Sequence, residues 1–406
     1  METFLEMHPL PAPGERLSQT VRRLRDEAGP VTPVELPGGV AAWLVTSYDA
    51  VNEILAHDSD LFSNDPRNFA ALHDGTIPAD WPLRYMVQAD HLLMKDGTEH
   101  RRLRSLVSRA FTPALVHALE PGIRTLAGEL LDRVADEGDG VDLVRHYTEP
   151  LPITVICELF GVPAQDRDHI RDWTRTLVSF GAAPPELAKT GAELRAYLSA
   201  HVRWRRRDPG DDLTTALCLA RDEDGDGLID DELVWVLWVM IMSGHETTVH
   251  LITNAVVALC SDREQLGAAI AGDGWAEVVE EALRSRSSVV NALCRYPLRD
   301  VRIGGVTVRA GQALVIGFGA TGTDPARFGE DAERFDVSRA PEAHLGFGRG
   351  EHSCLGGPLA RLEAGIALSM LFTRFPGLRL AVDAGDLDYT LSISTEGPTA
   401  LPVLPR

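Results

Sequence analysis

Apolar residues recur at intervals of three and four over most of the chain between about residues 47 and 293. This spacing places them on one face of an α-helix, so the segment is predicted to be mainly helical. The pattern is clearest in residues 119–138 and 185–207. A further helix is predicted over residues 358–375, where Pro358 suits the first turn.

Two other segments show the patterns of β-strands. Residues 31–46 predict two short strands around the turn Pro37-Gly38-Gly39, and residues 301–317 predict a hairpin with Gly304-Gly305 at its turn. No internal repeat or low-complexity linker divides the chain. We therefore expect a mainly α fold with small β sheets, in a single domain that spans residues 1–406.

Charge and composition narrow the class of protein. The net charge of −21 argues against nucleic acid or an anionic membrane as the main partner. The longest apolar run, residues 233–242, is about half of what a bilayer requires. The N-terminus does not resemble a signal peptide. The five cysteines are scattered and form no CxxC pair, which favours a reducing, cytoplasmic setting over a disulfide framework.

One cysteine, Cys354, stands in the glycine-rich stretch HLGFGRGEHSCLGG, residues 344–357. A buried, inert cysteine is the ordinary interpretation of such a residue. Here, however, Gly350 and Gly356 let the backbone lie flat against a planar ligand. The helix predicted after Cys354 also directs the positive end of its dipole at the sulfur, which favours a thiolate. The local pattern therefore indicates a metal-ligating cysteine.

The stretch resembles the haem-binding signature of the cytochrome P450 monooxygenases, and residues 357–363 resemble the bacterial, actinomycete-type branch of that family. The signature positions are Phe347, Gly348, Gly350, His352, Cys354 and Gly356. The resemblance implies haem b (iron protoporphyrin IX) with Cys354 as its axial thiolate, and with Phe347, Gly348 and Gly356 beside it. It further implies a P450 fold, in which haem lies between a long central helix and the cysteine-bearing loop and helix.

The long apolar helix expected from about Asp231 to Cys260 is interrupted by polar residues 243–248. A zinc-binding HExxH helix is excluded, because His245 and His250 are five residues apart and lie on different faces. A core network of back-bonded hydroxyls is an alternative. The resemblance implies an oxygen-activating segment, in which Gly244 leaves room for oxygen, Thr247 bonds it and Glu246 relays protons. Ser243 stands where the family usually has alanine.

The resemblance assigns structural and cofactor-binding roles to charged residues elsewhere. Glu281 and Arg284, in the pattern ExxR, would form a buried ion network with Arg334. The two haem propionates would be bound by four basic residues, each of which is by itself equally consistent with a solvated charge: His100, Arg104, Arg295 and His352.

The activity implied is insertion of one oxygen atom from O2 into an apolar small molecule by hydroxylation or epoxidation, in secondary metabolism of polyketide, terpenoid, steroid or cyclic-peptide type. Electrons would come from NAD(P)H through ferredoxin reductase and ferredoxin, which could dock on Arg101 and Arg102. Oxidative C–C or C–N coupling of aromatic substrates, and a non-catalytic haem sensor or carrier, are the alternatives. The substrate pocket is expected to be apolar, with Trp81, Phe180 and Val289 among its candidate residues.

Overall fold

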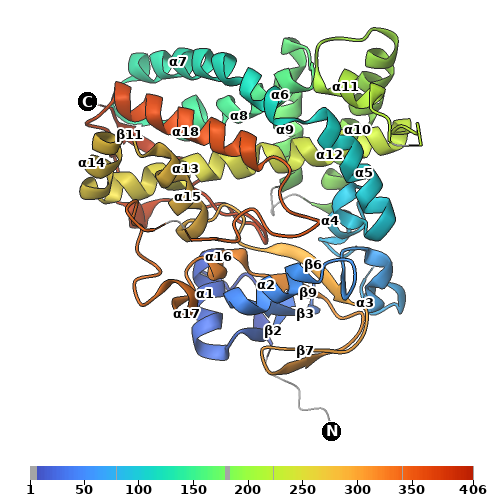
Figure 1. The fold of residues 1–406 in the computed structure, drawn as a ribbon. Helices are drawn as coiled ribbons and strands as arrows, with labels where there is room; N and C mark the ends of the chain where they lie inside the picture. The colour runs from blue at the N-terminus through green and yellow to red at the C-terminus, as the bar shows by residue number, and fades with distance from the viewer. Residues whose placement is uncertain (1–6, 79, 179–182, 223, 341, 406) are drawn as a thin grey trace.

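The computed structural model describes residues 7–78, 80–178, 183–222, 224–340 and 342–405. Figure 1 shows the strands of the largest sheet grouped with α1 (Leu17–Ala28) and α2 (Tyr48–Ala56) at one end of the molecule. Five other helices are grouped at the other end: α7 (Glu120–Glu137), α8 (Pro150–Leu159), α12 (Asp230–Gly244), α13 (Glu246–Ser261) and α18 (Gly357–Arg374). The mainly α fold with small sheets that the sequence predicts is confirmed.

The helices in chain order are α1 Leu17–Ala28, α2 Tyr48–Ala56, α3 Ala70–His73, α4 Arg84–Val87, α5 Gly97–Ala110, α6 Pro113–Ala118, α7 Glu120–Glu137, α8 Pro150–Leu159, α9 Arg167–Val178, α10 Pro184–Arg207, α11 Leu213–Leu219, α12 Asp230–Gly244, α13 Glu246–Ser261, α14 Arg263–Gly272, α15 Trp275–Ser285, α16 Phe318–Thr321, α17 Pro325–Phe328 and α18 Gly357–Arg374. The helices predicted over residues 119–138, 185–207 and 358–375 are therefore confirmed within a residue of their predicted bounds.

The strands are β1 His8–Pro9, β2 Val31–Leu36, β3 Val40–Val45, β4 Phe62–Ser63, β5 Val141–Asp142, β6 Ala292–Pro297, β7 Val301–Ile303, β8 Val306–Val308, β9 Leu314–Ile316, β10 Arg379–Leu380 and β11 Pro402–Leu404. Six of them form one sheet in the order β1-β2-β3-β9-β6-β4. Three more form a small sheet, β10-β11-β5, and β7 pairs with β8.

Both predicted hairpins form, with one difference in the second. Strands β2 and β3 are antiparallel, with Leu36 opposite Val40, and β7 and β8 are antiparallel, with Ile303 opposite Val306. The last part of residues 301–317 leaves that hairpin, because β9 pairs in parallel with β3, with Trp43 opposite Leu314. A strand order of this kind depends on distant partners and cannot be deduced from local alternation.

The predicted central helix is two helices, α12 and α13, which meet at His245 (φ −88°, ψ −72°). Three hydroxyl groups near the junction donate to the carbonyl oxygen four residues earlier: Ser243 to Val239 at 2.6 Å, Thr247 to Ser243 at 2.6 Å and Thr248 to Gly244 at 3.1 Å. Back-bonding of this type bends helices, which explains the break.

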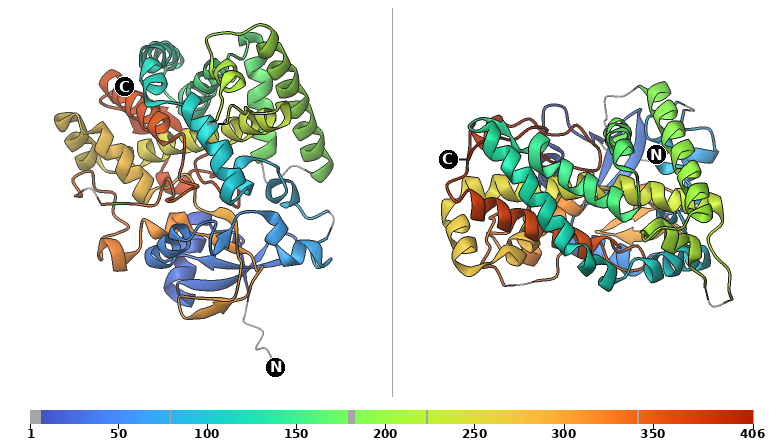
Figure 2. Two further views of the ribbon diagram at one scale, coloured as in Figure 1. Left: turned by 45° about the vertical axis from the view of Figure 1, so that its right-hand side comes forward. Right: turned by 90° about the horizontal axis from the view of Figure 1, so that it is seen from above.

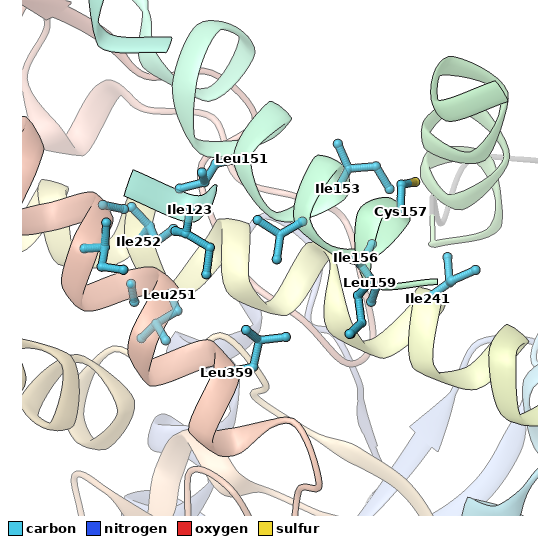
Figure 3. Close-up of a cluster of buried hydrophobic side chains, with 14 of the residues drawn as sticks. Ile123, Leu151, Ile153, Ile156, Cys157, Leu159, Ile241, Leu251, Ile252 and Leu359 are labelled. Atoms are coloured by element: carbon cyan, nitrogen blue, oxygen red, sulfur yellow. The ribbon is translucent and has the colours of Figure 1, made fainter. Parts of the chain in front are cut away.

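The core of the helical part holds the bent central helix against its neighbours. Figure 3 shows Ile156 and Leu159 of α8, Ile241 of α12 and Leu359 of α18 among its buried side chains. Figure 2, viewed from above, shows α18 running beside α13 and α7, in agreement with contacts between these helices. This packing fixes the start of α18 relative to the α12–α13 junction. Within the described ranges, we find no helix long and apolar enough to cross a membrane.

Candidate functional site

A cavity of about 320 Å³ lies between the α12–α13 junction and the loop that leads into α18. Its wall is mostly apolar and includes Leu92 and Met94 before α5, Val239 and Met240 of α12, and Leu293 of β6. The wall brings together nine of the site residues predicted from the sequence: Arg104, Gly244, Thr247, Arg295, Phe347, Gly348, His352, Cys354 and Gly356.

Cys354 forms part of this wall just before α18 begins, and its exposed surface opens into the cavity, surrounded by protein. Its main-chain N–H donates to the carbonyl of Phe347 at 2.8 Å, which fixes the loop around it. Burial raises the pKa of the Cys354 thiol, while the main-chain N–H groups of Gly356 and Gly357 and the charge of Arg104 act in the opposite direction. A coordinated metal ion deprotonates a thiol outright, so the site is suited to a metal-bound thiolate.

The glycines of the loop have different roles. Gly348 and Gly350 have positive φ angles of 66° and 80°, which only glycine adopts readily. A Cβ atom on Gly350 would lie 2.6 Å from the carbonyl oxygen of Leu55. Gly350 thus allows the loop to approach α2 and does not face the cavity, contrary to the expectation from sequence. Gly356 does form part of the wall.

The α12–α13 junction places Gly244 and Thr247 at the cavity and Glu246 outside it. A Cβ atom on Gly244 would lie 2.6 Å from Cδ1 of Ile156, so packing against α8 also requires glycine there. The Glu246 carboxylate accepts a hydrogen bond from Oγ1 of Thr395 at 3.3 Å and lies 3.5 Å from Nε2 of His250. Sequence reasoning had identified neither of these partners.

Glu281 and Arg284 of α15 form the predicted buried pair. Nε and Nη2 of Arg284 donate to the two carboxylate oxygens of Glu281 at 2.7 and 2.6 Å. The assignment of Arg334 is wrong: its side chain is exposed, and only its main-chain carbonyl accepts a hydrogen bond from Arg284, at 3.0 Å. The additional guanidinium near Glu281 belongs to Arg339, whose Nε is 3.9 Å from Oε1.

Basic side chains gather at one edge of the cavity. His100 is buried, and within the described residues neither of its ring nitrogens has a hydrogen-bond partner, although Nδ1 lies 4.0 Å from the Glu351 carboxylate. Burial, followed by the charge of His352, lowers the pKa of His100 to about 4, so the ring is neutral. Arg104 donates to the carbonyl of Ser353 at 2.7 Å, and Arg295 is buried. A neutral imidazole with free nitrogens and two guanidinium groups fit a ligand that carries carboxylates.

The three residues predicted for the substrate pocket differ in outcome, and one of them is placed at the cavity. Val289 forms part of the cavity wall. Trp81 lies instead in the core around the large sheet, where its indole N–H donates to the carbonyl of Pro37 at 2.8 Å. Phe180 lies outside the described residues. The sequence alone does not show whether an aromatic residue in a predicted loop lines the cavity or packs in the core.

An iron porphyrin is planar, binds a thiolate at its iron and carries two carboxylates. The cavity wall offers Cys354 for the iron, Gly348 and Gly356 for a flat ring, and basic side chains for the carboxylates. The fold and the cavity together define a haem-thiolate protein. The family model of cytochrome P450 matches residues 276–380. Cytochrome P450 107B1 of Saccharopolyspora erythraea is 39% identical over 94% of this chain and 93% of that protein.

Two further relatives agree with this match. Mycinamicin IV hydroxylase/epoxidase of Micromonospora griseorubida is 36% identical over 93% of each protein. The solved structure of CYP154C4 from Streptomyces sp. W2061 has a TM-score of 0.93 and 38% identity, and the match covers 99% of this chain and 98% of that one. The chain belongs to the cytochrome P450 family. It is a bacterial-type P450 monooxygenase, and haem is its cofactor.

Proposed function

We propose that residues 1–406 form one cytoplasmic enzyme unit that binds haem b and hydroxylates or epoxidises a neutral, apolar small molecule in secondary metabolism. The observation that carries this proposal is the placement of Cys354 and of Gly244 and Thr247 on the wall of one cavity. Haem bound there would supply oxygen activation with two external electrons. The relative named as a hydroxylase/epoxidase supports oxygen insertion over a sensor or carrier role.

Different residues of the chain would bind different parts of that cofactor. Cys354 would ligate the iron, and Phe347, Gly348 and Gly356 would flank it. Four basic residues would hold its carboxylates: His100, Arg104, Arg295 and His352. The charged side chains of the described wall come from α5, β6 and the cysteine loop and helix. The part of the wall formed by residues 92–94, 239–247 and 288–293 is apolar apart from serine and threonine hydroxyls. A neutral substrate fits this distribution.

The proposed function is tested by the absorbance difference spectrum of the purified, dithionite-reduced protein with and without carbon monoxide. A strongly red-shifted Soret band is expected, because a thiolate donates electron density to the iron. Product analysis with NAD(P)H, ferredoxin and ferredoxin reductase then distinguishes oxygen insertion from oxidative coupling of aromatic substrates. A purified protein that neither contains nor takes up haem would contradict the proposal.

Thr247 is proposed to hold protons at the cavity. Its hydroxyl donates to the Ser243 carbonyl, so its lone pairs are free to accept a hydrogen bond from a group in the cavity. We expect Thr247→Ala to retain haem but to form roughly tenfold less product per NAD(P)H, because a positioned proton carrier is lost. The missing electrons should appear as hydrogen peroxide, which a peroxidase assay measures.

Thr247→Ser keeps the hydroxyl and should restore coupling. Thr253→Ala is the matched control, because Thr253 has the same type of back-bond, to Val249 at 2.6 Å, but does not line the cavity. Full coupling in Thr247→Ala would show that the proton-holding role is wrong.

Electron delivery is proposed to use Arg101, on the face that carries the cysteine loop. Arg101 is 58% exposed and pairs with Glu351 at 3.3 Å. Its neighbour Arg102, which forms an ion pair with Glu232, is only 32% exposed and so is less accessible to a partner. An acidic ferredoxin would be attracted to this face.

We expect Arg101→Gln to slow reduction by ferredoxin by about threefold at low ionic strength. The difference should shrink at high salt, where exposed charges are screened. Stopped-flow reduction rates measure it. Arg207→Gln, at the exposed end of α10, is the control and should reduce at the wild-type rate. An Arg101→Gln rate equal to that of the control at every salt concentration would rule out this docking site.

A further inference from the structure

One carboxyl group, that of Glu363 in α18, lies on the described wall of the cavity. Leu359 and Ala360, one turn earlier in the same helix, line the cavity as well. Glu363 is buried, with only 3% of its surface exposed, and within the described ranges its Oε2 has no hydrogen-bond partner. The acid predicted from the sequence, Glu246, points away from the cavity, so the acid on the wall is one that the polar motif did not indicate.

Burial decides the charge of Glu363. It raises the pKa of the Glu363 carboxyl well above its usual value. An unpaired carboxylate in an apolar wall costs far more free energy than the neutral acid does, which explains this direction. A protonated carboxyl group can donate a hydrogen bond, whereas a carboxylate can only accept. Glu363 therefore offers the cavity an O–H donor.

The neighbouring helix α13 offers acceptors to the same cavity. Thr247 and Thr248 both lie on the wall. Each hydroxyl hydrogen is directed to a main-chain carbonyl, at 2.6 Å for Thr247 and 3.1 Å for Thr248, so the lone pairs of both oxygens remain able to accept. Helix α18 runs beside α13 and contacts it (Figure 2). The wall thus carries a donor on one helix and two acceptors on the next, an arrangement that water can bridge because it binds where several polar partners are present.

We propose that Glu363 is a second proton-holding residue of the cavity: its carboxyl O–H donates to water bound between α18 and α13 and supplies protons along that water towards Thr247. In this transfer the O–H bond of Glu363 breaks, an O–H bond to the adjoining water oxygen forms, and no electron is exchanged. The carboxylate left behind regains a proton from solvent along the same water before the next turnover. This inference rests on the proposed function, because protons are consumed at the cavity only if oxygen is reduced there.

Infrared difference spectroscopy of the haem-loaded protein tests Glu363 without reference to catalysis. We expect a C=O band of a protonated carboxyl group at neutral pH, and we expect Glu363→Gln, which keeps the size of the side chain, to lack it. In D2O the band should shift to lower frequency within minutes, because water that reaches the cavity exchanges the carboxyl hydrogen. The proposal is overturned if the wild type and Glu363→Gln show the same bands, or if the hydrogen exchanges only when the protein unfolds.

Thr248→Val tests the acceptor side, because it removes the hydroxyl and keeps the shape of the side chain. The bridging water loses a partner, so the hydrogen bond from Glu363 weakens and its C=O band should move to higher frequency. Thr253→Val is the matched control, since Thr253 has the same type of back-bond in α13 but is not on the described wall. Equal band positions in the two variants would contradict a water bridge between the helices.

During turnover, Glu363→Gln is expected to form roughly tenfold less product per NAD(P)H, because a positioned proton donor is lost. The missing electrons should appear as hydrogen peroxide, while the haem content and the carbon monoxide band stay at wild-type values. Glu129→Gln, at an exposed position of α7, is the control and should remain fully coupled. Full coupling in Glu363→Gln would show that Glu363 supplies no protons. Failure of the proposed function would be seen separately, as a wild-type protein without the thiolate-type carbon monoxide band.

Discussion

Cys354→Ala is expected to lose the thiolate-type carbon monoxide band and to lower monooxygenase turnover by at least about 1000-fold. The thiolate is the group that favours O–O cleavage at the iron. No other cysteine can replace it, because Cys354 is the cysteine that lines the cavity, whereas Cys157, Cys218 and Cys294 are buried elsewhere and Cys260 is half-buried in α13. The carbon monoxide difference spectrum and product formation are the two measurements.

The fold should survive this substitution. The main-chain bond from Cys354 to Phe347 and the start of α18 do not depend on the sulfur. Circular dichroism should therefore show wild-type helix content in Cys354→Ala. Cys260→Ala is the control and should keep both the band and the activity. A normal band in Cys354→Ala would mean that the axial ligand has been assigned to the wrong residue.

Arg284→Ala is expected to lower the free energy of unfolding by about 3–5 kcal/mol, because it leaves the buried Glu281 carboxylate without its partner. Arg284 also donates to the carbonyls of Ala332, at 2.6 Å, and Arg334, and these groups lose their donor as well. A loss of this size is a large part of the stability of a typical protein. Denaturant unfolding, followed by circular dichroism, measures it.

Arg334→Gln tests whether the side chain or only the main-chain carbonyl of Arg334 belongs to the network around Glu281 and Arg284. The structure assigns only the main-chain carbonyl of Arg334 to the network, so replacing its exposed side chain should change the free energy of unfolding by less than about 0.5 kcal/mol. If Arg334→Gln were as destabilising as Arg284→Ala, the three-charge network expected from the sequence would be correct after all.

The chemistry of the cysteine loop could be predicted because it is local. Phe347, Cys354 and Gly356 belong to one short stretch, and the helix that follows begins where Pro358 indicates. Spacing within such a stretch limits the geometry, whatever the rest of the chain does. The same holds for Glu281 and Arg284, which are one helical turn apart and so face the same side of α15.

The partners of side chains that contact distant segments could not be predicted from the sequence. Whether the side chain of Arg334 or of Arg339 reaches Glu281 depends on the path of residues 329–339 over α15, which no local pattern reveals. The sequence did not indicate that Asp58 is buried against His352, because a carboxylate in a polar loop is usually solvated. Glu246 was assigned by its place in a motif, but His250 and Thr395 decide where its carboxylate points.

The sequence by itself determined the helical pattern, the ligating cysteine and the resemblance to the haem-thiolate family, because each of these depends on short-range spacing along the chain. Only the tertiary structure decided which protein groups the basic side chains at the cavity edge contact. His352 lies against Asp58 and Lys95, while the ring nitrogens of His100 find no hydrogen-bond partner among the described residues. The physical reason is that these contacts join segments far apart in the sequence, so that no local pattern specifies them.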